Sequence, residues 1–332
     1  MAGKVWGELA VLLALAMSFI SQALIMSHGQ TPSTMQKNWL QRTKPISIAH
    51  RGSSATFPGN TIEAFLEADR VGAEMIELDI AVCKSGEILV HHDPYLPDGS
   101  LLRDAEYDHI KKVFPNIVTL REVLSALQDS SIKLYLDMKG QHIVQPTLQL
   151  LYDVVNNGSW EPTRFLVATF NQYDLLKVAA YKQKYQLLKS IETIVIIDSV
   201  PFGYAKSLAK LQVNYISVGQ GCIVPEFVED AHKRGIKVMA WTVNNVNMMK
   251  HFMSIGVYGI CTDYPEKVAE VQSEMRSQFM NSNAGMESSL CSSPAEVDFA
   301  DPCTYLESLI KDDIEFSLQL DRIQQQQQQL NI

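Results

Sequence analysis

Residues 75–93 read MIELDIAVCKSGEILVHHD, and this stretch establishes the pattern on which the fold depends. Met75–Val82 is an apolar, β-branched run in which Glu77 and Asp79 are the acidic residues, which is typical of a buried strand. A second and shorter run, Ile88–His91, follows it. The pattern predicts a full strand and then an additional short hairpin strand.

The same apolar runs recur on both sides of this stretch, with helical patterns between them. The predicted strands, besides the two above, are Ile46–His50, Ile132–Met138, Arg164–Phe170, Tyr185–Lys189, Val213–Val218, Lys237–Val243 and Gly259–Thr262. The predicted helices are Thr61–Val71, Leu120–Gln128, Gln145–Asn156, Gln172–Lys182, Val200–Leu211, Pro225–Arg234 and Asn245–Ser254. The first of these helices opens on Asn60-Thr-Ile-Glu63, which resembles a capping box.

Strands that alternate with helices of this length imply βαβ units and a parallel sheet. If Ile88–His91 is an extra hairpin strand, eight repeats remain. Residues 45–272 span 228 positions, and this length fits an α/β fold of the (β/α)₈ TIM-barrel type, which typically takes about 250 residues, better than a doubly wound sheet. The sequence therefore predicts a TIM barrel with a small insertion after its second strand.

The N-terminal end lies outside this repeat. Leu9–Met26 is an 18-residue stretch without charge. Its length is compatible with a transmembrane anchor and with a cleaved signal peptide, and a buried helix is the third alternative. We therefore expect residues 1–27 to be a signal peptide or a membrane anchor, residues 28–44 to be a linker, and the protein to be membrane-anchored or exported.

The C-terminal residues 273–332 predict an acidic tail. Residues 280–302 are rich in Asn, Ser, Gly and Pro, as in a flexible linker. Apolar residues then recur at every fourth position from Leu306 to Leu318, which predicts one amphipathic helix, and Gln324–Gln329 is a polyglutamine run. The helix either packs on the main domain as a solvated helix or docks on a protein partner.

Composition excludes several classes of protein. The 332 residues include 28 Lys and Arg against 37 Asp and Glu, a formal charge of −9, whereas nucleic-acid binding needs a basic surface. Residues 287–332 hold nine acids and two bases, so −7 of this charge belongs to the tail and −2 to the rest. A hydrophobic fraction of 46% argues against global disorder. The five cysteines form no C-x-x-C pair, so a disulfide scaffold and a zinc ribbon are both poor interpretations.

Residues capable of chemistry gather where the predicted strands end. Active sites of TIM barrels lie at the carboxyl ends of the strands. The residue groups at or near these ends are His50-Arg51-Gly52, Glu77-Leu78-Asp79, His91-His92-Asp93, Asp137-Met138-Lys139, Thr169-Phe170-Asn171, Trp241-Thr242-Val243-Asn244 and Thr262-Asp263. This distribution predicts one site built from nearly every strand.

The acidic residues of this set favour a hard metal ion. Glu77 and Asp79 are two positions apart on a strand, so their side chains face the same side, and Asp137 is a third carboxylate from the next strand. Three carboxylates without a Cys/His set favour Mg²⁺ or Ca²⁺ over zinc. The alternative is a set of salt bridges with Lys139 or Arg51.

The remaining members suit proton transfer and phosphate binding. His50 and His92 end neighbouring β-segments and suit general acid and base work, and Asp93 can orient an imidazole. Arg51 has a planar guanidinium suited to phosphate, whereas His91 faces the other side of its strand and is expected to be structural. The set predicts phosphoryl-transfer hydrolysis. Motifs of the GxxxxGK[ST], GxGxxG and GxSxG types are absent, so nucleotide use and ordinary serine-esterase chemistry are unsupported.

The motifs together resemble those of the glycerophosphodiester phosphodiesterases. The matching stretches run in family order over about 220 residues: IAHRGSSATFPGNTIEAF (48–65), GAEMIELDIAVCKSGEILVHHD (72–93), LYLDMKG (134–140), ATFNQ (168–172), GIKVMAWTVN (235–244) and YGICTDYPEKV (258–268). The resemblance implies a TIM barrel that uses a divalent metal to hydrolyse glycerophosphodiesters to an alcohol and glycerol 3-phosphate. Some relatives act on lysophospholipids as lysophospholipase D.

By this resemblance His50 and His92 are the catalytic acid/base pair, and Arg51 and Lys139 contact the substrate phosphate. The implied metal ligands are Glu77, Asp79 and Asp137, and Trp241 and Asn171 are expected to line the substrate cleft.

The chain departs from the family pattern at three places. Asp137 stands where an E-x-K motif usually has Glu, Gly59 stands where Glu usually precedes Asn-Thr, and residues 94–110 replace the usual segment after His92. Three functions therefore remain open: a glycerophosphodiester phosphodiesterase, a lysophospholipase D-type enzyme acting on lysolipids, and a catalytically impaired, membrane-tethered binding protein.

Overall fold

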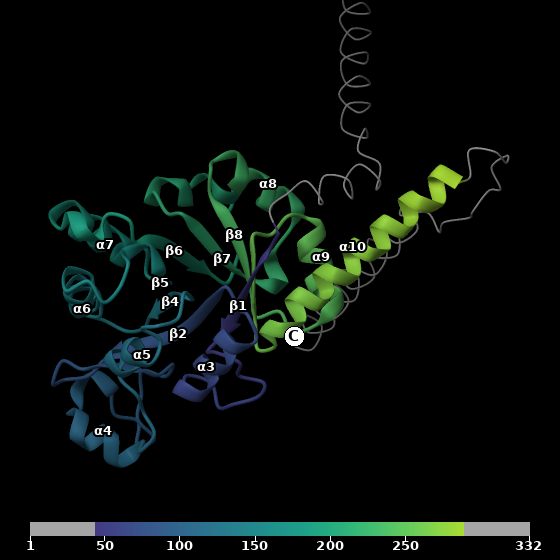
Figure 1. Cartoon of the computed structure of the whole chain (residues 1–332). Coiled ribbons are helices and arrows are strands. Elements are labelled where there is room, and N and C mark those ends of the chain that lie inside the picture. The colour runs from purple at the N-terminus through teal and green to yellow at the C-terminus, as the bar shows by residue number, and fades with distance from the viewer. Residues whose placement is uncertain (1–43, 289–332) are drawn as a thin grey trace, which may run out of the picture. The chain divides into compact units, whose positions relative to one another are not determined.

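The structure, a computed structural model, describes residues 44–288. Its centre is a closed barrel of eight parallel strands (Figure 1). They are β1 (Ile46–His50), β2 (Met75–Val82), β4 (Lys133–Met138), β5 (Phe165–Thr169), β6 (Glu192–Ile197), β7 (Tyr215–Gly219), β8 (Lys237–Trp241) and β9 (Gly259–Thr262). Strand β1 pairs with both β2 and β9, and this double pairing closes the barrel. The predicted TIM barrel is confirmed.

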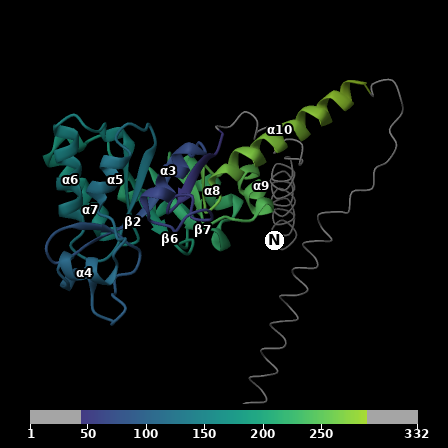
Figure 2. The ribbon, with the colours of Figure 1, turned by 60° about the horizontal axis from the view of Figure 1, so that its bottom comes forward.

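Helices follow most strands and surround the barrel (Figures 1 and 2). They are α3 (Ile62–Arg70), α5 (Leu120–Ala126), α6 (Val144–Asn156), α7 (Gln172–Lys184), α8 (Pro225–Lys233), α9 (Val246–Ser254) and α10 (Pro265–Ser288). Short 3₁₀ turns lie at Leu102–Asp104, Pro162–Arg164, Gln186–Leu188, Tyr204–Lys206, Leu208–Leu211 and Gln220–Cys222. The α-helices bury apolar stripes against the outer faces of the strands.

The predicted insertion after the second strand is also confirmed. Strand β3 (Ile88–Val90) pairs with β2 in antiparallel orientation, and α4 (Tyr107–Val113) follows before α5 begins. The segment has its own small apolar cluster, which includes Cys83, Leu102 and Ile110. It therefore adds to the barrel without interrupting it.

Two predicted elements are wrong. Tyr185–Lys189 is not a strand, because the chain makes a 3₁₀ turn there, and the strand is instead β6, whose first residue is the polar Glu192. Val200–Leu211 is not one α-helix. Pro201 and Gly203, the latter with φ of +79°, interrupt its start, and only two short 3₁₀ turns follow, Tyr204–Lys206 and Leu208–Leu211.

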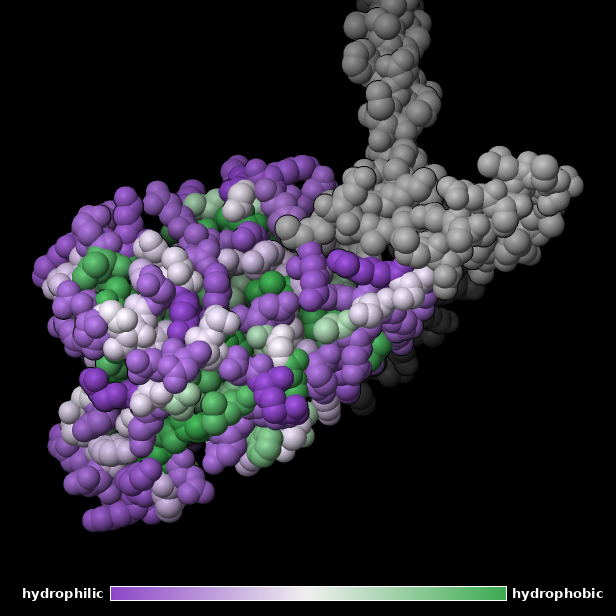
Figure 3. Space-filling model, viewed as in Figure 1, coloured by the Kyte–Doolittle hydropathy of each residue, from purple (hydrophilic) through white to green (hydrophobic). Residues whose placement is uncertain are grey.

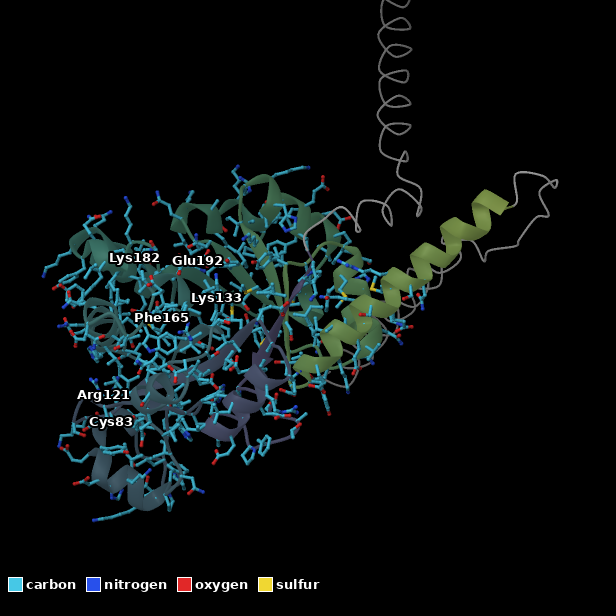
Figure 4. All side chains as sticks on the ribbon, viewed as in Figure 1. Cys83, Arg121, Lys133, Phe165, Lys182 and Glu192 are labelled. Carbon is cyan, nitrogen blue, oxygen red and sulfur yellow. The ribbon has the colours of Figure 1, made fainter. Side chains whose placement is uncertain are left out.

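The alternation of side chains places an apolar plug at one end of the barrel and polar residues at the other. Inward positions near the strand starts include Ile48, Met75 and Tyr215, which belong to the cluster that fills the interior. At this end Glu192 accepts a hydrogen bond of 3.0 Å from the Tyr215 hydroxyl and lies 3.4 Å from Lys133 Nζ (Figure 4). The functional residues lie at the opposite, carboxyl end.

The last helix crosses the predicted end of the barrel domain. Helix α10 continues through residue 272 to Ser288, so it also covers the first positions of the predicted linker at 280–302. The predicted segment 1–27, most of the linker 28–44, the amphipathic helix and the polyglutamine run lie outside the described residues. Within residues 44–288 no helix has the length and apolar character needed to cross a membrane. Figure 3 shows hydrophobic residues in separate patches among hydrophilic ones on this face of the molecule.

Candidate active site

A left-handed turn at the end of β1 brings two successive side chains to the same pocket. Neighbouring residues on a strand point to opposite sides, but Arg51 has φ of +57° and Gly52 has φ of +84°. A Cβ atom at Gly52 would lie 2.6 Å from the carbonyl carbon of Ala64, so glycine is required there. The turn places both His50 and Arg51 in the pocket lining.

Three carboxylates from β2 and β4 converge inside the barrel. Glu77 and Asp79 are inward positions of β2, and Asp137 lies opposite Asp79 in the β2–β4 register. Each offers an oxygen within 4.8 Å of the others, and all three residues are buried, at 5% exposure or less. The predicted same-side arrangement of Glu77 and Asp79, with Asp137 as a third acid, is present.

Basic and amide groups surround this triad. Lys139 Nζ lies 2.5 Å from Asp137 Oδ2 and 3.2 Å from Asp79 Oδ1. Arg51 Nε lies 3.1 Å from Asp79 Oδ2, although its N–H does not make a well-directed hydrogen bond. The salt bridges that the sequence left open as an alternative to a metal site are therefore present.

Burial is the largest influence on the pKa values of the three acids. Burial, with the nearby Asp79 and Asp137, raises the pKa of Glu77 well above its usual range. Burial likewise raises the pKa of Asp137 to about 6, against the opposing effect of Lys139. Burial also acts to raise the pKa of Asp79, but Lys139 and Asn60 outweigh it and the net shift is downward. The two raised values indicate that the nearby cations do not offset the cost of burying the charged carboxylates.

The triad fits a divalent cation. Asp137 Oδ1 is buried and has no hydrogen-bond partner, so one carboxylate oxygen remains without a ligand or donor. The donor set consists of carboxylate oxygens alone, which Mg²⁺ and Ca²⁺ prefer. The acidic triad therefore has the composition to hold a divalent metal ion.

Each of the two predicted catalytic histidines has a carboxylate partner. His50 Nδ1 lies 2.7 Å from Asp263 Oδ1, and His92 Nδ1 lies 2.7 Å from Asp93 Oδ1. A hydrogen bond at Nδ1 leaves Nε2 as the nitrogen available for proton transfer. The His50 side chain is 22% exposed and that of His92 is 46% exposed. The two histidines therefore differ in their access to solvent.

Asp263 is held more firmly than Asp93. It accepts hydrogen bonds from Ser54 Oγ at 2.8 Å and from Asn244 Nδ2 at 2.6 Å, in addition to its contact with His50. The hydrogen bond with His50, and those with Ser54 and Asn244, lower the pKa of Asp263 to about 2. Asp263 is therefore an anion at neutral pH and fixes the orientation of His50.

The pocket at this end of the barrel has a volume of about 140 Å³. Its lining residues are His50, Arg51, Glu77, Asp79, His92, Tyr135, Asp137, Lys139, Phe170, Ile196, Trp241 and Cys261. Eight of the nine predicted site residues are among them. Asn171 is not, because its side chain caps helix α7 by accepting a hydrogen bond from the Tyr173 amide at 3.2 Å.

Sequence reasoning assigned no site role to two residues that support the site. Asn60 donates a 2.9 Å hydrogen bond to Asp79 Oδ2. The predicted capping box at Asn60 is absent, because the N-cap of α3 is Thr61, whose side chain accepts from the Ala64 amide. Asp263 is among the residues capable of chemistry at the predicted strand ends, but the sequence assigns it no specific role. The signals were its position after the last strand and the asparagine next to Thr61, but neither indicates a partner. His91, predicted to be structural, packs against Phe114 with ring centroids 4.9 Å apart.

A family model and several curated proteins match this chain. The profile described as the glycerophosphoryl diester phosphodiesterase family matches residues 50–267. A glycerophosphodiester phosphodiesterase of Caldanaerobacter subterraneus is 30% identical over 241 residues, which are 67% of this chain and 96% of that protein. A lysophospholipase D of Rattus norvegicus is 20% identical and matches 74% of this chain and 91% of its own length.

Solved structures show the same fold. A phosphodiesterase of Oleispira antarctica, determined in complex with its product sn-glycerol-3-phosphate, has a TM-score of 0.60 and 24% identity, covering 69% of this chain and 97% of its own. A second solved structure, of a protein from Galdieria sulphuraria, has a TM-score of 0.61 and 23% identity, covering 70% of this chain and 99% of its own. With the family match and the similarity to the Caldanaerobacter enzyme, the chain belongs to the glycerophosphoryl diester phosphodiesterase family and is a phosphoric diester hydrolase.

Proposed function

We propose that the protein hydrolyses a glycerophosphodiester to an alcohol and glycerol 3-phosphate with the help of a divalent cation, Mg²⁺ or Ca²⁺. The observation that carries the proposal is the placement of the acidic triad, two carboxylate-oriented histidines, Arg51 and Lys139 around one pocket of about 140 Å³. The Oleispira structure supports the product class, since that related fold binds sn-glycerol-3-phosphate.

Each group has a role that its surroundings allow. Glu77, Asp79 and Asp137 would hold the metal, which when bound supplies positive charge to the phosphate oxygens. The side chains of Arg51 and Lys139 bind the phosphate directly, in addition to the metal. His50 and His92 present Nε2 for proton transfer, one removing a proton from the attacking water and the other giving a proton to the leaving alcohol oxygen. Asp263 and Asp93 keep the Nδ1 proton in place and stabilise the imidazolium.

The wall of the pocket formed by β5, β6 and β8 favours a second candidate substrate. Phe170 and Trp241 meet edge to face with centroids 5.8 Å apart, and Ile196 lies in the same lining. Phe170 lies next to Lys139, whose Nζ is 5.3 Å from its ring centroid, and an apolar wall beside a phosphate-binding group suits a lysophospholipid as well as a glycerophosphodiester. The similarity to a lysophospholipase D supports this alternative.

The test uses purified full-length protein with glycerophosphocholine or lysophosphatidylcholine, supplied with Mg²⁺, Ca²⁺ or EDTA. We expect release of choline that EDTA abolishes. Release of choline undiminished by EDTA would contradict the metal assignment. No turnover of either diester would favour the third function, an impaired binding protein.

The histidine assignment is tested by substitution. We expect His50→Ala and His92→Ala each to lower kcat about 10²- to 10⁴-fold, the usual contribution of a general acid or base. Asn171→Ala is the matched control, since Asn171 caps helix α7 outside the pocket. Activity that survives in the double histidine variant would contradict the acid/base roles.

We also propose that the uncharged stretch Leu9–Met26 anchors the protein in a membrane or directs its export. N-terminal sequencing of the mature protein, together with carbonate extraction of membranes, separates the two outcomes. If the mature protein keeps Leu9–Met26 and carbonate nevertheless extracts it from membranes, the segment is neither a membrane anchor nor a cleaved signal peptide. The amphipathic helix from Leu306 to Leu318 is proposed either to pack on the domain or to bind a protein partner.

A further inference from the structure

We propose that the half of the catalytic face above β5–β8 is a docking surface for a zwitterionic phospholipid layer, from which the pocket takes its substrate. This surface, the apolar rim, consists of Phe170, Tyr173, Phe202, Tyr204, Val224 and Val246. The inference rests on the proposed function, because it concerns how a lipid phosphodiester reaches the same pocket.

Exposed apolar side chains are concentrated at the carboxyl ends of the strands. Among residues 44–288, eight of the twelve exposed large hydrophobic side chains follow the end of a barrel strand or of its hairpin extension. Six of these eight form the rim, and they follow four consecutive strands in the barrel order. Monomeric soluble proteins scatter such residues singly, whereas a concentration beside a site marks an interaction surface.

The most exposed member projects from a rigid turn. Phe202 is fully exposed, and it lies between Pro201 and Gly203, after which Tyr204 also has a positive φ of +56°. Tyr173, in the first turn of α7, is 77% exposed. Tyr204 packs on the buried Phe227 of α8, with ring centroids 6.5 Å apart. The turn is therefore attached to the barrel, and its aromatic tip faces solvent instead of folding back.

The charges of the rim match an uncharged or zwitterionic layer. The segments that carry it, 170–173, 198–206, 219–224 and 242–247, contain one acid, Asp198, and one base, Lys206. The opposite half of the face has a different composition, because the segment 92–106 alone holds four acids. Aromatic and large apolar side chains are favourable at the boundary of headgroups and acyl chains. A surface without net charge has no electrostatic preference for an anionic layer.

The rim is continuous with the apolar wall of the pocket. Phe170 belongs to both, since it is 44% exposed and also lines the pocket beside Trp241. A lipid whose phosphate lies between Arg51 and Lys139 can therefore lead its acyl chain over Phe170 to the rim. A protein bound to the rim would cover the entrance, whereas a lipid layer would supply the substrate itself. This favours lipid as the occupant.

The experiment compares one substrate presented in a layer with another in solution. Full-length protein is assayed for choline release from lysophosphatidylcholine in phosphatidylcholine vesicles and from soluble glycerophosphocholine. The test variant is the triple substitution Tyr173→Ser, Phe202→Ser and Val246→Ser, and the control is Leu66→Ser with Leu187→Ser. Both control residues are exposed to 43% or more but lie in or after helices on the side of the barrel.

We expect the triple variant to lose about 10-fold or more in rate on vesicles, through a higher apparent KM for lipid, and to stay within about twofold on the soluble diester. The control variant should keep both rates within about twofold. The loss should be the same at low and high salt, because the rim carries no net charge.

Two results would overturn the proposal. They are an unchanged ratio of the two rates in the triple variant, whether or not both rates fall, and a wild-type protein that acts only on the soluble diester. If the wild type hydrolyses neither substrate, the proposed function fails. Co-sedimentation with vesicles then tests separately whether the apolar rim binds a lipid layer. Equal sedimentation of wild type and triple variant would overturn it, and about 10-fold weaker sedimentation of the variant would support it.

Discussion

At the scale of single residues, Asp137 is the most informative member of the acidic triad. Its Oδ1 atom is buried without a partner, and burial raises its pKa to about 6. A buried carboxylate oxygen normally has a hydrogen-bond donor, and none within the protein serves Asp137 Oδ1. The oxygen is therefore open to a ligand from outside the chain. Asp137 is one methylene shorter than the Glu usual at this position, and it nevertheless lies within 4.8 Å of both other acids.

The metal site makes a prediction that requires no activity. Addition of Mg²⁺ or Ca²⁺ at about 100 times its Kd should stabilise the wild type by about 2.7 kcal/mol and raise Tm by about 5–10 °C. Asp137→Asn should remove most of this increase, because it removes one of three anionic ligands. Differential scanning fluorimetry checks it, with the exposed Asp108→Asn as control. An equal increase in Asp137→Asn would contradict the assignment.

The His50–Asp263 pair makes a prediction about pH. The pKa of Asp263 is about 2 in the folded state, below the usual 3.8 of an aspartate side chain. A lowered pKa stabilises the fold above the unfolded value, and the contribution is lost as the pH falls through about 2. Because the side chain is 29% exposed, we expect about 1–2 kcal/mol.

Asp263→Asn should therefore lower Tm at neutral pH, and the difference from wild type should shrink below about pH 4. Thermal unfolding at a series of pH values measures it. A difference that grew as the pH fell below about 4 would show that the anionic form of Asp263 is not what stabilises the fold.

The residues of the site were predictable where the pattern of the strands determines their direction. Glu77 and Asp79 follow from alternation on one strand, and Asp137 follows from the next parallel strand. Asn60 and Asp263 were not, because their roles depend on contacts 19 and 213 residues away in sequence, which no local pattern reports. Asn171 illustrates the opposite error, since a polar residue at a strand end also serves as a helix cap.

At the scale of elements, the turn between β1 and α3 shows how backbone geometry directs side chains. Gly52→Ala should destabilise the protein by about 3 kcal/mol or more, because the positive φ alone costs about 1–2 kcal/mol and the new Cβ also meets backbone atoms of Ala64. Gly72→Ala is the matched control, since its φ is +83° and nothing lies within 4 Å of the added Cβ. Urea unfolding measures both variants, and equal losses would contradict the steric argument.

Most elements were predictable because their periodicity is strong, and the failures have local causes. Tyr185–Lys189 has two leucines and an aromatic residue, which imitate a short strand, but it lies directly after a helix and only Leu188 is buried in its 3₁₀ turn. Strand β6 begins on Glu192, whose polar side chain is compensated by Tyr215 and Lys133 from other strands. The sequence around Glu192 does not reveal these contacts, because Tyr215 and Lys133 lie far from it in the chain.

At the scale of the whole molecule, hydrogen bonds join the start of the barrel domain, around β1, to helix α10 at its end. The buried Gln272 of α10 donates a 2.6 Å hydrogen bond to the carbonyl of Pro45, just before β1. Ser47 donates to the carbonyl of Pro265 at 2.8 Å. These bonds join residues more than 200 positions apart, so the start of α10 is part of the barrel.

Gln272→Ala should lower the free energy of unfolding by about 1–3 kcal/mol, because a buried carbonyl loses its donor. Gln278→Ala on the same helix should change it by less than about 0.5 kcal/mol, since that residue is exposed. Chemical denaturation of the full chain compares them. Similar effects of the two substitutions would show that the bond to Pro45 does not contribute to stability.

The contact between His50 and Asp263 has a consequence for the life of the chain in the cell. One partner is on the first strand and the other follows the last, 213 residues later. While the protein is being synthesised, the imidazole emerges from the ribosome long before its carboxylate. A nascent or proteolytically shortened chain therefore lacks an oriented His50, and full hydrolytic activity begins only when the last strand of the barrel has been delivered and closed against the first.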